Sequence, residues 1–249
     1  MNGTPAIEIR HLTKHYKGNS APAVNNVNIS VAKGEIFGLL GPNGAGKTTT
    51  LSVLCGLMKQ SSGAALINGL SHSLNREDIK KIIGVVPQEI ALFPSLTAFE
   101  NLRYFGNMYG LKGNHLTDKI NKYLGEFGLS EVKNKLVGTF SGGMKRRVNL
   151  IAGVLHDPEI LFLDEPTVGV DVHSRSVIME FLRTLNKNGT TIIYTSHLME
   201  EAQQFCTRIS IIDQGNIIAN GSPAGLISEY GSINLEELFL KLTGRNLRD

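Results

Sequence analysis

Cysteines and long apolar runs are scarce in this sequence, and both absences limit what the protein can be. Only Cys55 and Cys206 occur among its 249 residues. That number is too small for a disulfide framework and is typical of a reducing compartment such as the cytoplasm. No apolar run approaches the roughly 18 residues of a membrane-spanning helix, so we expect a chain that does not cross a bilayer. Residues 1–17 also lack the apolar stretch of a secretory signal.

An excess of charge of one sign is also missing. The 25 lysines and arginines nearly balance the 22 aspartates and glutamates, which leaves a formal net charge of +3. This balance predicts that the protein has no nucleic-acid partner. Hydrophobic residues make up 41% of the chain and charged residues 19%, as in a globular protein with a sizeable core. No internal repeat or low-complexity segment is visible, so we expect one large domain or two closely packed subdomains.

The apolar pattern of the first part of the chain predicts strands. Residues 6–10 and 27–31 alternate apolar and polar side chains, as half-exposed antiparallel strands do. Residues 36–40 are apolar throughout, as in a strand that is covered on both faces. A glycine-rich loop and a helix from about 47 to 57 come next. Strand, loop and helix in this order form the start of a βαβ unit.

The last part of the chain follows the same pattern. It predicts a buried strand at 160–163, a helix at 174–186, a strand at 191–195 and a hairpin of strands at 208–213 and 217–220. Near the end, Leu235, Leu238, Phe239 and Leu242 form the apolar face of another helix, which would either pack on the core or help the chain to dimerise.

The segment between these parts is mostly helical in pattern. Thr97 followed by Glu100 is the signature of a capping box at a helix start. We therefore predict an α/β fold with a mostly parallel sheet, an N-terminal antiparallel β subdomain and an inserted α-helical subdomain. The expected divisions of this single domain are listed here: an α/β core at 1–87 and 158–220, a helical subdomain at 88–157 and a C-terminal helical extension at 221–249.

The glycine-rich loop matches the motif G-x-x-x-x-G-K-S/T in full. Its residues are Gly41, Pro42, Asn43, Gly44, Ala45, Gly46, Lys47 and Thr48. Glycines let backbone N–H groups turn inward around phosphate oxygens, Lys47 adds a positive charge near the outer phosphates, and the Thr48 hydroxyl can hold Mg²⁺. The helix that follows directs its N-terminus at the same anion. A plain glycine-rich turn is the alternative, but the predicted strand before the motif and helix after it favour a phosphate-binding loop of the P-loop NTPase type.

Two acidic residues follow the predicted buried strand at 160–163. Asp164, at the carboxyl end of that strand, is placed to hold Mg²⁺ through water. Side chains alternate along an extended chain, so Glu165 points elsewhere and is a candidate base for the attacking water. The alternative is that the pair merely ends the strand before Pro166.

Two further residues occupy the edges of predicted strands. His197 follows the strand at 191–195, at the carboxyl edge where open α/β sheets bind their ligands. Gln88 lies at the entry to the helical segment, and its amide can reach Mg²⁺ or the attacking water. Without the other motifs, a structural histidine and a surface glutamine would be the better interpretations.

The stretch Phe140–Arg147, "FSGGMKRR", reads as a helix start in an unusual place. Ser141 is a good N-cap, and apolar residues at helical spacing run on until just before Pro158. Three basic residues (Lys145, Arg146 and Arg147) nevertheless follow the cap, at the end of the helix where its dipole disfavours cations.

Together these motifs resemble the ATP-binding-cassette (ABC) ATPases over nearly the whole chain. The resemblance is carried by "GPNGAGKTT" at 41–49, Gln88, "SGGMKRR" at 141–147, "ILFLDEP" at 160–166, Asp171 in "VGVD", and His197. Phe140 and Met144 depart from the Leu and Gln of many members, but the hydroxyl of Ser141 and the glycine backbone remain. The resemblance implies that His197 contacts the terminal phosphate, that Tyr16 stacks on adenine and that Thr49 belongs to the phosphate loop.

The resemblance also implies an explanation for the odd helix start. In this family two subunits pack head to tail, and Ser141, Gly142 and Gly143 would bind the ATP of the other subunit through the helix N-terminus. Asp171 would lie at the dimer interface. A capped helix with a solvated basic face is the plainer alternative, and we expect the three basic side chains after the cap to be mostly solvated in either case.

The ending "LEELFLKLTG" at 235–244, with "SGGMKRR" and "PTVGVD", resembles the ATPases of bacterial exporters. This implies hydrolysis of ATP with Mg²⁺, a second ATP-binding subunit (a homodimer), and a separate transmembrane permease at the cytoplasmic face of the membrane. Leu92, Phe93 and Phe99 are candidates for docking the permease, or else pack internally. The rival functions are a soluble ABC-type ATPase, for example in iron–sulfur assembly, and a nucleotide-binding regulator, which would lack a base such as Glu165.

Overall fold

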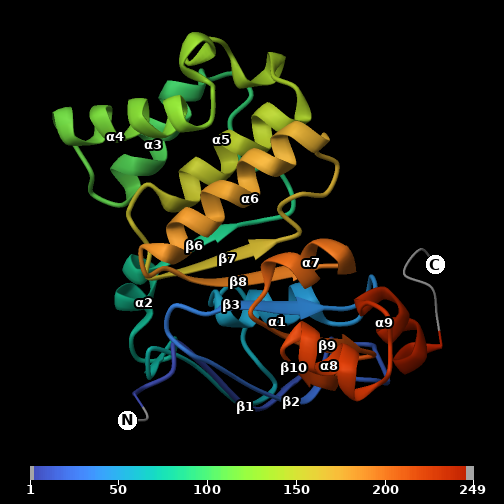
Figure 1. The fold of residues 1–249 in the computed structure, drawn as a ribbon. Helices are drawn as coiled ribbons and strands as arrows, with labels where there is room; N and C mark the ends of the chain where they lie inside the picture. Colours follow the sequence, from blue (N-terminus) through green and yellow to red (C-terminus); the bar gives the residue numbers. More distant parts are fainter. Residues whose placement is uncertain (1–2, 245–249) are drawn as a thin grey trace.

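The computed structural model describes residues 3–244, and its centre is a sheet of six strands in the order β10-β9-β3-β8-β7-β6 (Figure 1). The bounds of these strands are β3 Ile36–Leu40, β6 Ile83–Val86, β7 Ile160–Asp164, β8 Thr191–Ser196, β9 Arg208–Asp213 and β10 Asn216–Gly221. All neighbours pair in parallel except β10, which forms an antiparallel hairpin with β9. The predicted mostly parallel α/β core is confirmed.

A second, antiparallel sheet contains the N-terminal strands in the order β2-β1-β4-β5. Its strands are β1 Ile7–Lys14, β2 Val24–Val31, β4 Ser62–Ile67 and β5 Leu70–Ser71. The two predicted strands are therefore longer than their alternating segments. Helix α1 (Lys47–Leu54) lies between the sheets, because Leu51 shares one apolar core with Ile7 of β1 and Phe37 of β3.

The other face of the central sheet is covered by helices. Helices α5 (Gly142–Val154), α6 (Val172–Lys187) and α7 (Met199–Phe205) share a core with Ile36 and Leu40 of β3. The residues of β3 thus alternate between two cores, which explains why the whole strand is apolar. Helix α2 (Arg76–Ile82) precedes β6, and α8 (Pro223–Glu229) packs beside β10.

The inserted segment projects from the helical side of the sheet, at the top of Figure 1. It contains α3 (Ala98–Met108), α4 (Gly113–Glu126), two short 3₁₀ turns at Ser130–Val132 and Val137–Thr139, and α5. The capping box at the start of α3 is confirmed, since Thr97 accepts from the Glu100 N–H and Glu100 accepts from the Thr97 N–H. The limits 88 and 157 of the helical subdomain stay a prediction.

Helix α9 (Leu235–Thr243) packs on the core. Leu235, Leu238 and Phe239 are fully buried in the same cluster as α7, so the predicted apolar face is used within the chain. Residues 245–249 of the predicted C-terminal extension lie outside the described part. Within residues 3–244, no helix combines the length and apolar character that crossing a membrane requires.

The parallel strands bring four predicted motifs to one edge of the sheet. Strand β3 leads into the phosphate loop, β7 ends at Asp164, β8 leads into His197, and β6 leads towards Gln88. In the strand register Asp164 pairs with Thr195 and Leu40 pairs with Ser196, so these carboxyl ends are level. This edge is where ligands of such sheets bind.

Candidate active site at the sheet edge

The phosphate loop joins β3 to α1 through a tight backbone turn. Gly46, the N-cap of α1, has a φ of 110°, and a Cβ there would lie 2.6 Å from the Ala23 carbonyl oxygen. Both the left-handed backbone and the lack of space require glycine. The turn is closed by a hydrogen bond of 3.2 Å from the Ala45 N–H to the Pro42 carbonyl. The loop therefore ends with the N-terminus of α1, which is a ready anion site.

Lys47 is buried inside this loop, with 5% of its surface exposed. Its ammonium donates to the carbonyl oxygens of Gly41 at 2.8 Å and Pro42 at 3.0 Å, and it lies 3.4 Å from Glu165 Oε1. Burial lowers the pKa of Lys47, while the neighbouring carboxylates of Glu165 and Asp164 act in the opposite direction. The Lys47 ammonium is thus surrounded by two carbonyls of the loop itself and by the Glu165 carboxylate.

Asp164 is buried and held by two hydroxyl groups. Thr48 Oγ1 donates to Asp164 Oδ2 at 3.1 Å, and Thr195 Oγ1 donates to Oδ1 at 2.6 Å. Mg²⁺ is commonly held by one or two protein oxygens together with substrate phosphates and water, so the Thr48 hydroxyl and the Asp164 carboxylate fit such an ion. Residues 3–244 contain no cluster of three or more His, Cys, Asp or Glu side chains that would form a cage for a metal by itself.

Glu165 has an unusual backbone for its residue type. Its φ of 47° lies in the left-handed region, which costs free energy for a residue with a Cβ. Its N–H is held at 3.2 Å by the Thr195 carbonyl and at 3.1 Å by Thr195 Oγ1. These contacts keep the strained turn in place, and the turn directs the buried carboxylate into the site.

The Glu165 carboxylate lies between two basic groups. One oxygen faces Lys47, and the other is 3.1 Å from Nδ1 of His197, although this close approach lacks the geometry of a hydrogen bond. The His197 side chain is 28% exposed, so the ring forms part of the open side of the site. The structure thus brings Lys47, Glu165 and His197, which are far apart in the sequence, into one row.

Two other predicted site residues, Gln88 and Tyr16, are both exposed. Gln88 is exposed two residues after β6 ends. The Tyr16 ring is 38% exposed, and its hydroxyl is 3.2 Å from Thr49 Oγ1 at the start of α1. An aromatic ring beside the first turn of α1 is suitably placed to stack on a base whose phosphates occupy the loop.

Ser141 is the N-cap of α5, as predicted, and its hydroxyl accepts from the Met144 N–H at 3.3 Å. Next to it, a Cβ on Gly143 would lie 2.5 Å from Ser174 Oγ and 2.7 Å from Asp171 Oδ2. Asp171 caps α6 by accepting from the Ser174 N–H, and this bond lowers the pKa of Asp171. The starts of α5 and α6 are therefore packed together, and only glycine fits between them.

This pair of helix starts has different neighbours from the phosphate loop. The loop glycines at 41 and 46 pack against Ala23, Val24 and Ile212, whereas Gly142 and Gly143 face the segment 169–174. The serine motif is thus built into a separate part of the surface, and Ser141 itself is exposed. Nothing in its packing directs it to the loop of its own chain.

The expectation that the basic residues after the cap are mostly solvated is wrong for Arg146, which is only 4% exposed. Its guanidinium donates to the carbonyl oxygens of Pro87, Gln88 and Glu165. Arg147 is half-buried and donates to the Phe127 carbonyl at 2.7 Å. The positive charge of these side chains predicted that they face solvent. Their actual acceptors are backbone carbonyls, which every residue has and which a sequence therefore cannot reveal.

Glu201 in α7 is a second residue that sequence reasoning missed. Its carboxylate accepts from Thr167 Oγ1 at 2.7 Å and from the Tyr194 hydroxyl, and it lies 3.7 Å from Nε of Arg175. Burial raises the pKa of Glu201. The carboxylate thereby ties the segment after Glu165 to the helix that follows His197, and no local motif announces this contact.

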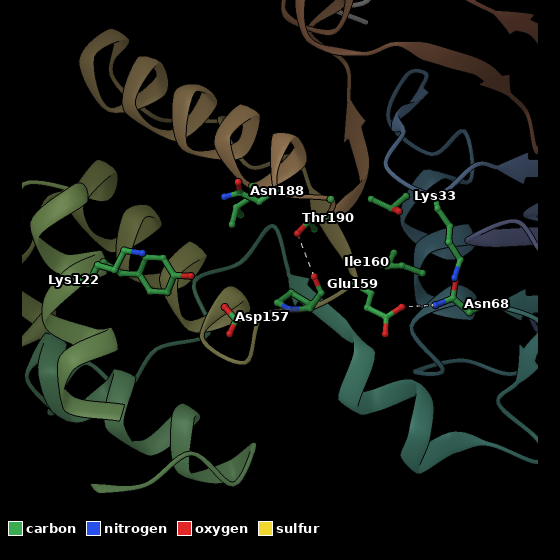
Figure 2. Close-up of a pocket in the computed structure, with 13 residues that line it drawn as sticks. Lys33, Asn68, Lys122, Asp157, Glu159, Ile160, Asn188 and Thr190 are labelled. Atoms are coloured by element: carbon green, nitrogen blue, oxygen red, sulfur yellow. Dashed lines mark hydrogen bonds between the residues drawn. The ribbon is translucent and has the colours of Figure 1, made fainter. Parts of the chain in front are cut away.

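A hollow of about 470 Å³ lies at the opposite edge of the sheet, beside the amino ends of β7 and β8 (Figure 2). Lys33, Lys122, Asp157 and Glu159 line it, and all four are exposed. The signs of these charges are mixed, and none of the lining residues is a predicted site residue. The chemistry predicted from sequence therefore lies at the other edge.

The comparisons with known proteins agree with this geometry. Residues 24–168 match the family model described as ABC transporter. The chain is 48% identical over 215 residues to the linearmycin resistance ATP-binding protein LnrL of Bacillus subtilis, covering 86% of this chain and 69% of that protein. It is 38% identical over 250 residues to the probable multidrug ABC transporter ATP-binding protein YbhF of Escherichia coli, covering 97% of this chain but only 43% of that protein.

A solved structure has the same fold. It is a dimeric ATP-binding cassette in a post-hydrolysis state, bound to ADP and phosphate. The TM-score is 0.79 at 28% sequence identity, and the match covers 87% of this chain and 98% of that one.

Lys47→Ala tests the assignment of the phosphate loop. It removes a charge-assisted contact to phosphate worth about 1.5–3 kcal/mol, so ATP affinity should fall by roughly 10- to 150-fold and hydrolysis should be lost. Binding of a fluorescent ATP analogue and release of phosphate measure the two effects. Lys33→Ala, at the opposite edge, is the control and should behave like the parent protein. Near-normal ATP turnover by Lys47→Ala would contradict the assignment of residues 41–48 as the phosphate loop.

Proposed function

This chain belongs to the ABC transporter family, and on that basis we propose that it is the ATP-hydrolysing subunit that powers export by a separate transmembrane permease. The observation that carries the proposal is the convergence of Lys47, Asp164, Glu165 and His197 on the mouth of the phosphate loop. The names of the relatives, which refer to linearmycin resistance and multidrug transport, favour export over iron–sulfur assembly or another soluble role.

Nucleotide binding would rearrange contacts that the loop now makes with itself. The phosphates of ATP would take the place of the Gly41 and Pro42 carbonyls and the Glu165 carboxylate around the Lys47 ammonium. The N–H groups of the loop and the N-terminus of α1 would hold the remaining oxygens. Thr48 and Asp164, with Gln88 from the loop after β6, would hold Mg²⁺, which neutralises phosphate charge when it is bound.

Hydrolysis would depend on Glu165. Once Lys47 is engaged by phosphate, the Glu165 carboxylate loses its cationic partner and is free to orient a water molecule and take its proton. His197, next to the second carboxylate oxygen, would hold the terminal phosphate and keep the carboxylate in place. The strained backbone of Glu165 is consistent with a residue that is positioned for chemistry.

Glu165→Gln tests this role. The amide keeps the size of the side chain but cannot accept the proton, so hydrolysis should slow by about 10²–10⁴-fold while ATP binding persists. The variant should also accumulate as an ATP-bound dimer on gel filtration. His197→Ala should likewise bind ATP and turn over poorly. We propose that MgATP joins two subunits and that hydrolysis releases them. A Glu165→Gln protein that stays monomeric with saturating MgATP would refute this step.

We further propose that the nucleotide site is completed by a second subunit, in a homodimer. The capped start of α5 exposes Ser141 and presents N–H groups and a helix dipole, which suit an anion. Because this helix start does not pack against the loop of its own chain, the phosphate that it binds would belong to the partner. Asp171 and the exposed first residues of α6, Val172 and His173, would form the adjoining part of the interface.

A pair of complementary lesions tests this arrangement. Lys47→Ala and Ser141→Arg each spoil every site of their own homodimer. In a mixed dimer one site carries both lesions, and the other combines an intact phosphate loop with an intact serine motif, so it should again occlude nucleotide. Purified, differently tagged heterodimers give the nucleotide occluded per dimer. Occlusion no greater than in either parent would contradict the shared site.

The permease is best accommodated by an aromatic patch on the helical insert, which we define as Phe93, Tyr104 and Phe105. Phe93 and Tyr104 are 42% and 46% exposed, and their rings lie 5.0 Å apart. Buried Asn101 fixes the loop by bonding both the N–H and the carbonyl of Phe93. Of the residues predicted for docking, Leu92 and Phe99 pack inward, so only Phe93 is offered to a partner. The complex would sit at the cytoplasmic face of the membrane.

Phe93→Asp tests the aromatic patch. A charge in the middle of an apolar contact should abolish copurification with the coexpressed transmembrane permease, since such anchors carry much of the binding free energy. Leu74→Asp is the matched control, because Leu74 is 85% exposed in the core domain and lies outside the patch. Both variants should keep the melting temperature of the parent. Equal copurification of the two variants would move the docking surface elsewhere.

A further inference from the structure

Arg146 is a buried cation to which no carboxylate of residues 3–244 is bound. It lies in the second turn of α5, at the end where the helix dipole disfavours a positive charge. Its Nη1 donates to the Pro87 carbonyl at 2.8 Å, and its Nη2 donates to the carbonyls of Gln88 at 2.7 Å and Glu165 at 3.3 Å. A charge this deeply buried is stable only with such acceptors, so the position of the guanidinium fixes the positions of three peptide groups.

The three peptide groups belong to two different parts of the nucleotide site. Pro87 and Gln88 form the exit from β6 into the helical insert, and Glu165 is the proposed catalytic base in its strained turn. One side chain from α5 therefore holds both the entry to the insert and the backbone of the base. Burial lowers the pKa of Arg146, and the carboxylates of Asp164 and Glu165 oppose that effect, so the cation also belongs electrostatically to this site.

The same helix carries the serine motif at its first turn. Ser141 caps α5, and Gly142 and Gly143 begin it, so Arg146 is one turn away from the groups that would bind the partner's nucleotide. The guanidinium is thus bonded to the Glu165 backbone and belongs to the same helix as the serine motif, so a movement of either one would displace it. A planar guanidinium that bonds two segments at once is more demanding in geometry than an ammonium.

We propose that Arg146 is a positioning residue that couples the hydrolytic site of one subunit to the helix start which that subunit presents to its partner. The inference rests on the proposed function. Nucleotide binding in the phosphate loop shifts Glu165 and Gln88, and Arg146 passes the shift to α5. In the reverse direction, engagement of Ser141 by the partner's nucleotide secures the Glu165 backbone for hydrolysis.

Arg147 provides a matched control in the next position. It has the same charge and size, lies in the same helix, and also donates to backbone carbonyls, namely those of Phe127 and Gly143. Both contacts remain within the helical insert, and neither reaches the segments that hold Gln88 or Glu165. Replacing Arg147 therefore perturbs α5 without cutting the proposed link.

The test compares Arg146→Met, Arg146→Lys and Arg147→Met. Displacement of the base by a fraction of an ångström to an ångström should lower kcat of Arg146→Met on the order of 10- to 100-fold. The affinity of the isolated subunit for ATP should stay close to that of the parent, since the phosphate loop is intact. Introduced into Glu165→Gln, Arg146→Met should also weaken the ATP-bound dimer. Arg146→Lys should recover part of the loss, and Arg147→Met should resemble the parent in all three measurements.

Equal rates of ATP hydrolysis in Arg146→Met and Arg147→Met would overturn the proposal, whether both variants match the parent or both fall below it. Hydrogen exchange on the unmutated protein gives an answer even if Arg146→Met fails to fold. At concentrations where the protein is monomeric, MgADP should alter exchange at 41–48, 86–89 and 142–148 together. A response at 41–48 and 86–89 without one at 142–148 would refute the coupling. No response at 41–48, with no hydrolysis, would instead refute the proposed function.

Discussion

The buried ammonium of Lys47 sets the condition that the rest of the site must meet. A cation that is 95% removed from solvent needs oxygen atoms around it, and in this structure they come from two loop carbonyls and Glu165. The phosphate oxygens of a bound nucleotide would replace these oxygens around the Lys47 ammonium. In the proposed function, nucleotide binding exchanges the partners around this one charge, and the carboxylate that it releases is the proposed base for hydrolysis. In this way a single electrostatic requirement links binding to chemistry.

Close packing extends this link across the molecule. Gly143 allows the start of α5 to touch the cap of α6, and Thr195 holds both Asp164 and the N–H of Glu165 from the neighbouring strand. Glu201 joins the segment after Glu165 to the helix after His197. Each contact is short and made by a buried group. A shift at the phosphate loop therefore has few ways to relax locally, because tightly packed interiors transmit small displacements.

Much of this architecture was predictable from sequence because strong local signals mark it. The continuous apolar strands, the capping box at Thr97 and the phosphate loop all follow from short-range chemistry. Helix α1 ends at Leu54 and not at 57, and Asp171 starts α6 earlier than the apolar pattern suggests. The burial of Arg146 was not predictable, since its acceptors are carbonyl oxygens that every residue possesses. The Glu201 contacts join residues that lie up to 34 positions apart, and such pairs leave no trace in a single sequence.

The backbone character of the Arg146 contacts has an evolutionary consequence. A link that ends on side chains is lost when either side chain changes, whereas a link that ends on peptide oxygens depends only on the path of the chain. A change of side chain at position 87 therefore leaves the connection to α5 intact as long as the turn after β6 keeps its shape, and at position 88 the side chain is constrained only by its proposed role at Mg²⁺. Changes in the aromatic patch of Phe93, Tyr104 and Phe105, such as adaptation to a different permease would require, likewise leave the contacts of Arg146 intact. The subunit can therefore adapt to a different permease while it keeps the proposed coupling through Arg146.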